Sequence, residues 1–518
     1  MTTPTSYDLV AYPGYTHVQT HPDRLAVTGT LFGLEPAPVT RCRVLELGCG
    51  NGSNLVPMAF GLPESEFLGL DLAAKPIARG QEMIAGLGLK NIQLRQGNLT
   101  EFDSRQGKFD YLIAHGLFSW VPPEVRDHLL ALCRQCLAPH GIAFISYNAL
   151  PGSHLRKMTR EMMLFHLRDL RDPEERVRQA RALAQFLADA VDTDDVYRLW
   201  MKSELETLRR HEAGHLFHDE LADVNEPYYF TQFVQQAARH GLKYLGEAEY
   251  SNMFDHGFNE ATKATLRQLS GNRILREQYL DFLRCRRFRQ TLLCHSEAPL
   301  KPEPDPGKVA RFLISSLARR TGDVDDLSPG KIMSSVTATG AKCATDFPLG
   351  KAALEVLGQD ELRPSPFAEL LAQASTRLAA AGLPVGCPDP PAELCAFLLQ
   401  LHEVGAIGFR TWLPPATRTV SPRPMVSALA RWQIQRQNYV ASPFHVCIKV
   451  QDDIGRLLLA ALDGTQDHAA LVEKMLALLH AGAEGATTDS DAAATRSKVG
   501  LELQDNLEKL ARLGLLVA

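Results

Sequence analysis

Residues 44–53 read VLELGCGNGS, and this stretch decides the fold of the N-terminal part of the chain. Glu46 is followed by glycines at every second position, Gly48, Gly50 and Gly52. A glycine-rich turn after a first β-strand serves two cofactor classes, dinucleotides and S-adenosylmethionine (SAM), and the glycine spacing separates them. The dinucleotide turn is Gly-x-Gly-x-x-Gly, with its third glycine where the helix packs on the strand. Here a serine occupies that third position, so the spacing disfavours a dinucleotide.

Length and composition indicate a multidomain globular protein. A chain of 518 residues with 45% hydrophobic and 22% charged residues is expected to form two to four domains. Its net charge of -5 provides no basic excess for binding nucleic acid. The N-terminus lacks a signal peptide pattern, and no apolar run reaches the length of a membrane span. Ten cysteines without disulfide-framework spacing suit a reducing compartment, so we expect a cytoplasmic protein that has no membrane partner.

Short apolar segments follow the first strand at regular intervals. We predict strands at 43–48, 66–71, 92–97, 109–116 and 141–148, separated by helical segments such as 75–88 and 123–139. This alternation predicts an α/β fold, a parallel and doubly wound Rossmann-like sheet. Ligands of such sheets bind beyond the carboxyl ends of the strands, where every candidate site residue named below falls.

The pattern Glu-x-Gly-x-Gly-x-Gly resembles motif I of the class I SAM-dependent methyltransferases. The resemblance implies that SAM is the cofactor. Glycines let the backbone approach a ligand closely, and the following helix N-terminus offers free N–H groups to a carboxylate. Glu46 is expected to accept from the SAM amino group or to hold the turn. The predicted cofactor-binding residues of this turn are Glu46, Gly48, Cys49, Gly50, Asn51 and Gly52.

Further cofactor candidates follow the second and third strands. Asp71 ends the second strand, where a carboxylate can take both ribose hydroxyls, and Leu72 comes next. Asn98 stands where this family usually has Asp, and its side-chain carbonyl can still accept from the adenine amino group. Leu99 is predicted to pack on the adenine face.

A second resemblance reaches most of the chain. The segments 7–26, 146–152 (SYNALPG) and 218–248, with its NEPYYF block, together resemble bacterial proteins that carry a methyltransferase regulatory domain. That family includes the rickettsial outer-membrane-protein lysine methyltransferases. The resemblance implies methyl transfer to a lysine amine of a protein substrate, and in such a reaction the enzyme mainly aligns an unprotonated amine.

Three residues at the ends of the fourth and fifth strands are the catalytic candidates. Tyr147 and Asn148 are predicted to orient the acceptor amine, although hydrogen bonding within the loop explains them equally well. His115 is predicted to line the cofactor and acceptor pockets. Its segment lacks the Asn/Asp-Pro-Pro-aromatic motif of nucleobase amino-methyltransferases, which argues against a DNA base as acceptor. Tyr15 and Gln19, with Tyr12, are predicted to come from an N-terminal flap over the cofactor.

HEAGH at 211–215 satisfies the zinc-protease pattern His-Glu-x-x-His. However, Gly214 would interrupt the required helix, and the stretch leads directly into the family-like block. We therefore interpret these residues as solvated polar residues at a helix end and predict no metal site.

The chain is divided as follows: a SAM-binding domain at 1–150, a helical connector or dimerisation region at 151–216, a regulatory domain at 217–300, and winged-helix-like modules at 301–518. A Pro-rich break at 296–308 marks a boundary, and a low-complexity loop is expected at 481–496. A winged helix often binds DNA, but residues 451–518 hold eleven acidic and six basic side chains. We expect this end to position protein rather than nucleic acid.

Two alternatives remain open on these grounds: a small-molecule or natural-product methyltransferase, and a non-catalytic SAM-binding scaffold. Since the assigned cofactor residues all precede residue 150, a fragment of about residues 1–300 is expected to retain SAM affinity.

Overall fold

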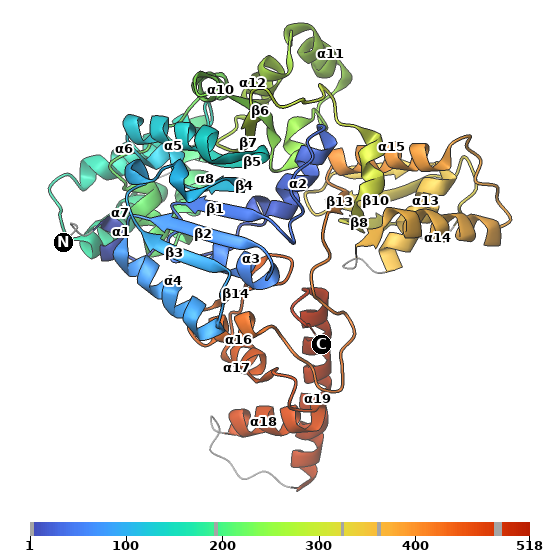
Figure 1. The fold of residues 1–518 in the computed structure, drawn as a ribbon. Helices are drawn as coiled ribbons and strands as arrows, with labels where there is room; N and C mark the ends of the chain where they lie inside the picture. Colours follow the sequence, from blue (N-terminus) through green and yellow to red (C-terminus); the bar gives the residue numbers. More distant parts are fainter. Residues whose placement is uncertain (1–4, 191–194, 323–325, 360–363, 481–488, 518) are drawn as a thin grey trace.

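The computed structural model describes residues 5–190, 195–322, 326–359, 364–480 and 489–517. Its centre is a seven-stranded sheet in the order β3-β2-β1-β4-β5-β7-β6 (Figure 1). The five parallel strands lie where the sequence predicts them; they are β1 (Arg43–Leu47), β2 (Glu66–Asp71), β3 (Ile92–Gln96), β4 (Phe109–Ala114) and β5 (Leu137–Asn148). The predicted α/β fold is therefore confirmed.

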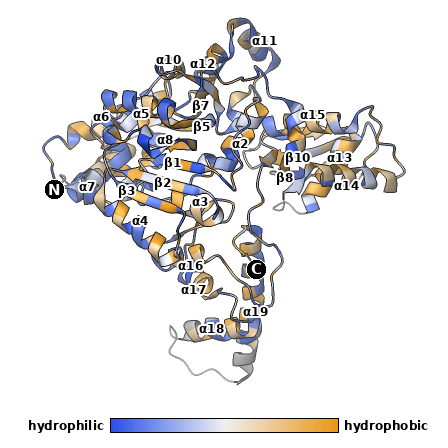
Figure 2. Cartoon of the chain, viewed as in Figure 1, coloured by the Kyte–Doolittle hydropathy of each residue, from blue (hydrophilic) through white to orange (hydrophobic). Residues whose placement is uncertain are grey.

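Side chains alternate along each strand, so apolar residues project from both faces of the sheet. Helices cover each of the two faces. Val44 points to the core that also holds α2 (Pro22–Leu31), α3 (Leu55–Gly61) and α4 (Ala74–Leu87). Leu45 and Leu47 point to the opposite core, with α5 (Pro123–Cys136) and α10 (Phe230–Arg239). Hydrophobic residues concentrate in the strands, whereas the covering helices have one hydrophobic and one hydrophilic side (Figure 2).

Two strands from far downstream complete the sheet. β7 (Phe288–His295) pairs antiparallel with β5, and β6 (Leu242–Glu247) pairs antiparallel with β7. The sheet thus becomes mixed, and it draws on residues well beyond the first 150. Arg289 of β7 is fully buried and bonds to three carboxylates, those of Glu247, Glu277 and Asp281, which ties these strands to α12 (Arg273–Arg284).

The connecting region is helical, as predicted. It contains α6 (Ser153–His166), α7 (Pro173–Asp189) and α8 (Val196–Arg210), which share a small core. After them come α9 (Ala213–His215) and a π-helical turn over Leu216–Glu220. Between β6 and β7 lie a 3₁₀ turn (Tyr250–Met253), α11 (Glu260–Leu269) and α12.

A separate module over residues 313–410 packs on α2. It comprises a sheet of β12 (Ser365–Pro366), β8 (Leu313–Ser316) and β13 (Ile407–Arg410), and a second sheet of β11 (Lys342–Thr345), β10 (Met333–Thr337) and β9 (Ala318–Thr321). The helices α13 (Pro348–Gln359), α14 (Phe367–Ala380) and α15 (Pro390–Glu403) cover them. Arg410 at the end of β13 forms a buried ion pair with Asp23 of α2, at 3.2 Å.

The C-terminal region lies below the sheet against α4 (Figure 1). It is built from α16 (Ala428–Ile434), the hairpin β14 (Tyr439–Ala441) and β15 (Cys447–Lys449), α17 (Asp453–Ala461), α18 (His468–His480) and α19 (Asp489–Arg512). Residues 489–496 of the low-complexity loop expected at 481–496 are helical instead, since α19 begins at Asp489; residues 481–488 lie outside the described residues. None of the helices that the structure describes is long and apolar enough to cross a membrane.

Candidate active site

The glycine loop between β1 and α3 forms the floor of the site. Gly48, Gly50 and Gly52 have φ angles of +75°, +54° and +71°, a region that favours glycine. A Cβ at Gly52 would lie 2.7 Å from Leu94 Cδ1, so this glycine is needed for packing. A Cβ at Gly50 would meet no protein atom within 4 Å. Gly50 therefore faces open space, where a cofactor has room to approach the backbone.

Asp71 at the end of β2 holds this loop. Its Oδ2 accepts from the Gly50 N–H and its Oδ1 from the Ala73 N–H, both at 2.8 Å. Burial raises the pKa of Asp71, while the two backbone N–H groups oppose that rise. Each carboxylate oxygen keeps a further lone pair, so the position is compatible with the predicted ribose contact.

Glu46 is the second carboxylate beside the loop, and it is 4% exposed. Its Oε1 accepts from Asn54 Nδ2 at 2.7 Å, whereas its buried Oε2 has no partner among the described residues. Burial raises the pKa of Glu46 to about 8. The hydrogen bond from Asn54 acts to lower this pKa, and the negative charge of Asp71 acts to raise it. A buried acceptor without a partner suits the ammonium group of SAM, so the residues present fit this cofactor.

Asn54 links Glu46 to His17 of the N-terminal region and to His445 of the C-terminal region. From the sequence, no role is predicted for Asn54. Its Oδ1 accepts from the His17 N–H at 2.9 Å and lies 2.9 Å from Nε2 of His445. Thr20 Oγ1 also donates to this oxygen, at 3.2 Å. Asn54 lies two residues after Gly52, and this closeness to the glycine run is its signal in the sequence. The His445 contact spans 391 positions and had no such signal.

Residues 5–17, here called the N-terminal strap, cover the glycine loop. Gly14 packs so closely that a Cβ there would lie 2.0 Å from Ser53 Oγ and 2.8 Å from Asn51 Oδ1. The Tyr15 ring stacks on His215 with 5.4 Å between centroids. The strap carries Tyr12 and Tyr15 of the predicted flap, and their place over a bound cofactor stays a prediction. Gln19, in contrast, lines a cavity of about 330 Å³ with α2, Tyr250 and residues of the 313–410 module.

The HEAGH residues lie under this strap and are only partly solvated: Gly214 is buried, whereas Ala213 is exposed and the other three residues are half-buried. A Cβ at Gly214 would lie 2.4 Å from the Ala11 carbonyl oxygen, which shows how closely the strap passes. His218 is 3% exposed, stacks on Tyr7 and has its Nε2 2.8 Å from the Val10 carbonyl. Across the described parts of the chain, no group of three His, Cys, Asp or Glu side chains is placed to hold a metal ion.

His115 lies at the end of β4, next to the strap. Its ring centroid is 4.0 Å from that of His17, and its buried Nδ1 has no partner among the described residues. Burial lowers the pKa of His115 well below 6.5, with a smaller effect from His17. Burial likewise lowers the pKa of His17 to about 4. Both imidazoles are therefore neutral at neutral pH.

Tyr147 and Asn148 point to opposite faces of β5. The Tyr147 hydroxyl lies 3.2 Å from Thr291 Oγ1, and its fully buried ring stacks on Phe233. Tyr147 thus belongs to the hydrophobic core that also holds Leu45 and Leu47, here called the second core. This position does not favour the predicted role of orienting an amine. Asn148 lies on the other face, which it shares with Phe144 and with Glu46 of β1. Its Oδ1 is buried and has no partner within the described structure.

The remaining cofactor candidates have mainly local contacts. Leu72 is 52% exposed, and Leu99 packs partly buried against the second core. Asn98 is exposed, and its Oδ1 accepts from the Thr100 N–H to cap a 3₁₀ turn. Cys49 is buried, and Asn51 Oδ1 accepts from the Ser53 N–H and hydroxyl. Their predicted contacts with SAM stay predictions.

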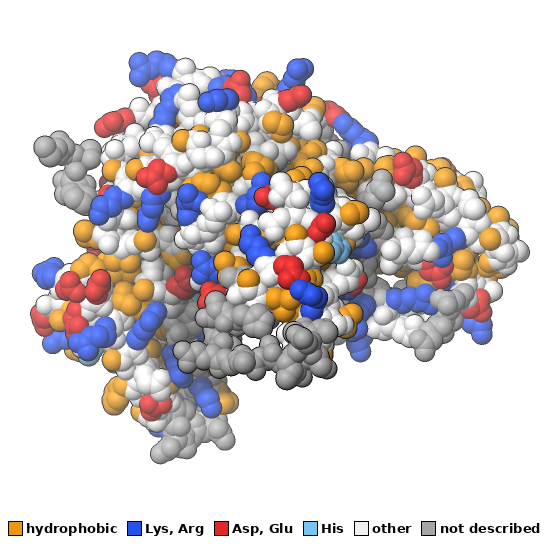
Figure 3. All heavy atoms as spheres, turned by 90° about the horizontal axis from the view of Figure 1, so that it is seen from below, with side chains coloured by type: hydrophobic (Ala, Val, Ile, Leu, Met, Phe, Trp, Pro, Cys, Tyr) orange, Lys and Arg blue, Asp and Glu red, His pale blue; other side chains and the backbone are white. Residues whose placement is uncertain are grey.

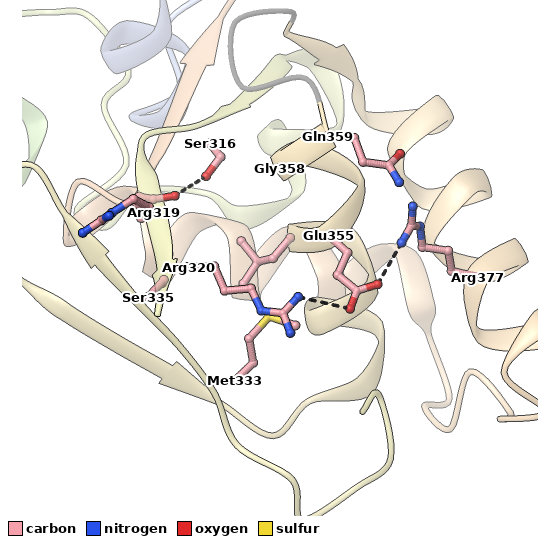
Figure 4. A pocket seen from close by; sticks show the side chains of 11 residues that line it. Ser316, Arg319, Arg320, Met333, Ser335, Glu355, Gly358, Gln359 and Arg377 are labelled. Carbon is pink, nitrogen blue, oxygen red and sulfur yellow. Dashed lines mark hydrogen bonds and ion pairs between the residues drawn. The ribbon is translucent and has the colours of Figure 1, made fainter. Parts of the chain in front are cut away.

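A larger cavity, of about 540 Å³, lies in the 313–410 module between β9, β10, α13 and α14 (Figure 4). Glu355 is shared there between Arg377 at 2.8 Å and Arg320 at 3.7 Å. None of its lining residues belongs to the glycine loop or to the carboxyl ends of the parallel strands, so it is distinct from the candidate active site.

Three family models match this chain in succession. Residues 44–141 match a methyltransferase domain, residues 212–295 a predicted methyltransferase regulatory domain, and residues 422–515 the PKMT C-terminal winged helix domain.

Relatives match along almost the whole length. The chain is 30% identical to the Rickettsia prowazekii protein RP789 over 528 aligned positions, which cover 99% of this chain and 93% of that protein. The structure of PKMT2 from Rickettsia typhi superposes with a TM-score of 0.84 at 28% identity, covering 98% of this chain and all of that one. PKMT2 in complex with AdoHcy gives a TM-score of 0.85 at 27% identity.

Proposed function

Because this chain belongs to the family of class I SAM-dependent methyltransferases that end in a PKMT-type winged helix, we propose that it methylates a lysine side-chain amine of a protein. The observation that carries the proposal is the likeness to PKMT2, a name that abbreviates protein lysine methyltransferase. This likeness covers 98% of the chain, so it includes the parts that lie outside the common methyltransferase domain.

The site is suited to holding SAM and a neutral amine side by side. When bound, SAM supplies an electrophilic methyl group on a sulfonium sulfur. Glu46, the glycine loop and Asp71 would hold this cofactor. Asn148 Oδ1, on the same sheet face as Glu46, can accept a hydrogen bond from an amine N–H and so orient the nitrogen.

The electrostatics near β4 favour an unprotonated amine. An ammonium group loses its charge more easily when it is buried without an anionic partner. His17 and His115 are neutral, so they add neither a positive nor a negative charge beside the strand ends. Asn148 is an uncharged acceptor as well, and it therefore stabilises an ammonium group less than a carboxylate in its place would.

Surface charge supports a protein acceptor over a nucleic acid. On the face seen in Figure 3, basic and acidic side chains are interspersed among hydrophobic ones over the described residues. A nucleic-acid reader requires basic residues gathered into a patch or stripe.

The test is identification of the methylated group. Purified full-length protein is incubated with SAM and a cell lysate, and the labelled peptides are analysed by mass spectrometry. Methyl-lysine supports the proposal. Methylation of other residue types, or of small molecules only, contradicts it and favours the small-molecule alternative.

Two adjacent residues provide a matched pair for the site. Asn148→Leu is expected to lower kcat at least about tenfold, the scale of one lost transition-state hydrogen bond, and to leave the SAM dissociation constant unchanged. Tyr147→Phe removes a hydroxyl on the opposite face and is expected to leave kcat within about twofold.

A further inference from the structure

The segment 212–228, at the start of the regulatory domain, contacts both sides of the candidate site. On the cofactor side, Tyr12 of the strap donates to Asp219 Oδ2 at 3.3 Å. On the acceptor side, the Tyr228 N–H donates to the Asn148 carbonyl and the Glu226 N–H to the Ser119 carbonyl, both at 2.9 Å. The segment is therefore built into the site rather than attached beside it.

Within this segment, Asn225 fixes the Asn148 side chain. Asn148 Nδ2 donates to Asn225 Oδ1 at 2.8 Å, and Asn225 Nδ2 donates to the Asp219 backbone carbonyl at 3.1 Å. Asn148 is 1% exposed, so its carboxamide is held in a closed environment.

The direction of this chain of hydrogen bonds is set by the backbone. A carbonyl oxygen only accepts, so the Asn225 amide must turn its Nδ2 toward Asp219 and its Oδ1 toward Asn148. The Asn148 amide must in turn present Nδ2 to Asn225. Its Oδ1 is the one atom of the relay without a partner within the described structure, and it points away from Asn225.

We propose that Asn225 is a positioning residue for methyl transfer, which holds Asn148 Oδ1 ready to accept from the N–H of the acceptor amine. The inference rests on the function proposed above and assigns a catalytic purpose to the regulatory domain. Without Asn225, the Asn148 amide is free to rotate and present Nδ2, a donor, to an amine whose lone pair must remain available.

The test compares variants at position 225 in the full-length protein, with the lysine-bearing acceptor that the wild type labels. Asn225→Leu is expected to lower kcat at least tenfold and to leave the SAM dissociation constant within twofold. Asn225→Asp keeps an oxygen opposite Asn148 Nδ2 and is expected to retain more kcat than Asn225→Leu, although its second carboxylate oxygen faces the Asp219 carbonyl and lowers the thermal midpoint further. A purely structural role would make both kcat and stability worst in Asn225→Asp.

A double mutant shows whether Asn225 affects kcat through Asn148. If Asn225 acts through Asn148, Asn148→Leu combined with Asn225→Leu is no slower than Asn148→Leu alone, within twofold. Asn259→Ala removes the exposed cap of α11 in the same domain and is the control, with unchanged kcat. The inference would be overturned by additive losses of kcat in the double mutant, by a parallel loss of SAM affinity, or by an unchanged kcat in Asn225→Leu. In each of these cases lysine methylation by the wild type would still stand. A wild type that methylates no protein lysine overturns the proposed function itself, and this inference with it.

Discussion

At the scale of single residues, the site combines two buried carboxylates with different surroundings. Asp71 has both oxygens bonded to backbone N–H groups, whereas Glu46 has one oxygen without a partner in the described structure. Burial raises the pKa of Glu46 to about 8. The Glu46 carboxyl is therefore largely protonated at pH 7 before a cation binds.

This state of Glu46 predicts a proton release on SAM binding. The ammonium group of SAM favours the carboxylate, so binding at pH 6–7 is expected to release about one proton and to tighten by up to about 1.4 kcal/mol per pH unit as pH rises. Calorimetry in buffers of different ionisation enthalpy measures the release. Glu46→Gln is the control, since its Oε1 can still accept from Asn54 Nδ2 but the side chain has no proton to lose. Equal proton release in this variant would contradict the assignment.

The same shift has a consequence for stability. A carboxyl whose folded-state pKa is raised favours the folded protein below its unfolded pKa. That contribution is lost as pH rises from the ordinary value of 4.5 through about 8. Glu46 is thus destabilising for the unliganded protein at neutral pH, a cost that the cofactor relieves.

At the scale of elements, the N-terminal strap is packed against the glycine loop through Gly14. Gly14→Ala would place a Cβ 2.0 Å from Ser53 Oγ and push the strap away. We expect SAM binding to weaken by about 1–3 kcal/mol, the usual cost of overpacking. Ser53→Gly as a second change removes the nearest atoms and is expected to restore part of the affinity, measured by calorimetry. Gly271→Ala, where a Cβ meets nothing within 4 Å, is the control.

The 313–410 module is joined to α2 by a buried ion pair. Asp23 is 0% exposed and accepts from Arg410 and from the Thr411 N–H. Asp23→Ala leaves a buried cation without its partner, and the free energy of the first unfolding transition is expected to fall by about 3–5 kcal/mol. Urea denaturation measures it. Glu66→Ala, which breaks the exposed pair with Arg43, should cost less than about 1 kcal/mol; equal losses in the two variants would refute the proposed importance of the buried pair.

At the scale of the whole molecule, the site is assembled from distant parts of the chain. His445 of the C-terminal region contacts Asn54, and Tyr439 donates to Glu212 Oε1 at 2.7 Å beneath the strap. A fragment of about residues 1–300, which is expected from the sequence to retain SAM affinity, lacks both contacts, and the structure therefore does not favour that expectation.

The remote contact can be tested in the full-length protein. His445→Leu removes one donor to Asn54 Oδ1, which keeps the His17 N–H, and is expected to weaken SAM binding by about 0.5–1.5 kcal/mol, the net value of one hydrogen bond. Calorimetry again measures the affinity. His468→Leu makes the same change elsewhere in the C-terminal region, where the ring contacts Ser421, and should have no effect. An unchanged affinity in His445→Leu would separate the C-terminal region from the cofactor site.

The parts that the sequence predicts well are those with local signals. The five parallel strands and the glycine turn follow from hydrophobic patterning and from glycine spacing over a few residues. Tyr147 and Asn148 show the limit, since neighbours in a strand point to opposite faces and the sequence does not say which one faces the crevice. Asn225 and His445 reach the site only through tertiary packing, and no spacing within the sequence indicates their contacts. HEAGH is less solvated than predicted for the same reason, because the strap that lies over Gly214 is about 200 residues away in the sequence.

The proposed transfer of a methyl group from SAM to a protein lysine is tested most directly by locating the transferred methyl group. Full-length protein is given SAM with a deuterated methyl group and a whole-cell extract, and the label is partitioned between protein and small-molecule fractions. We expect deuterated methyl-lysine in the protein fraction, strongly reduced for Asn148→Leu and retained for Tyr147→Phe. Label confined to small molecules, or protein label on residues other than lysine, would contradict it.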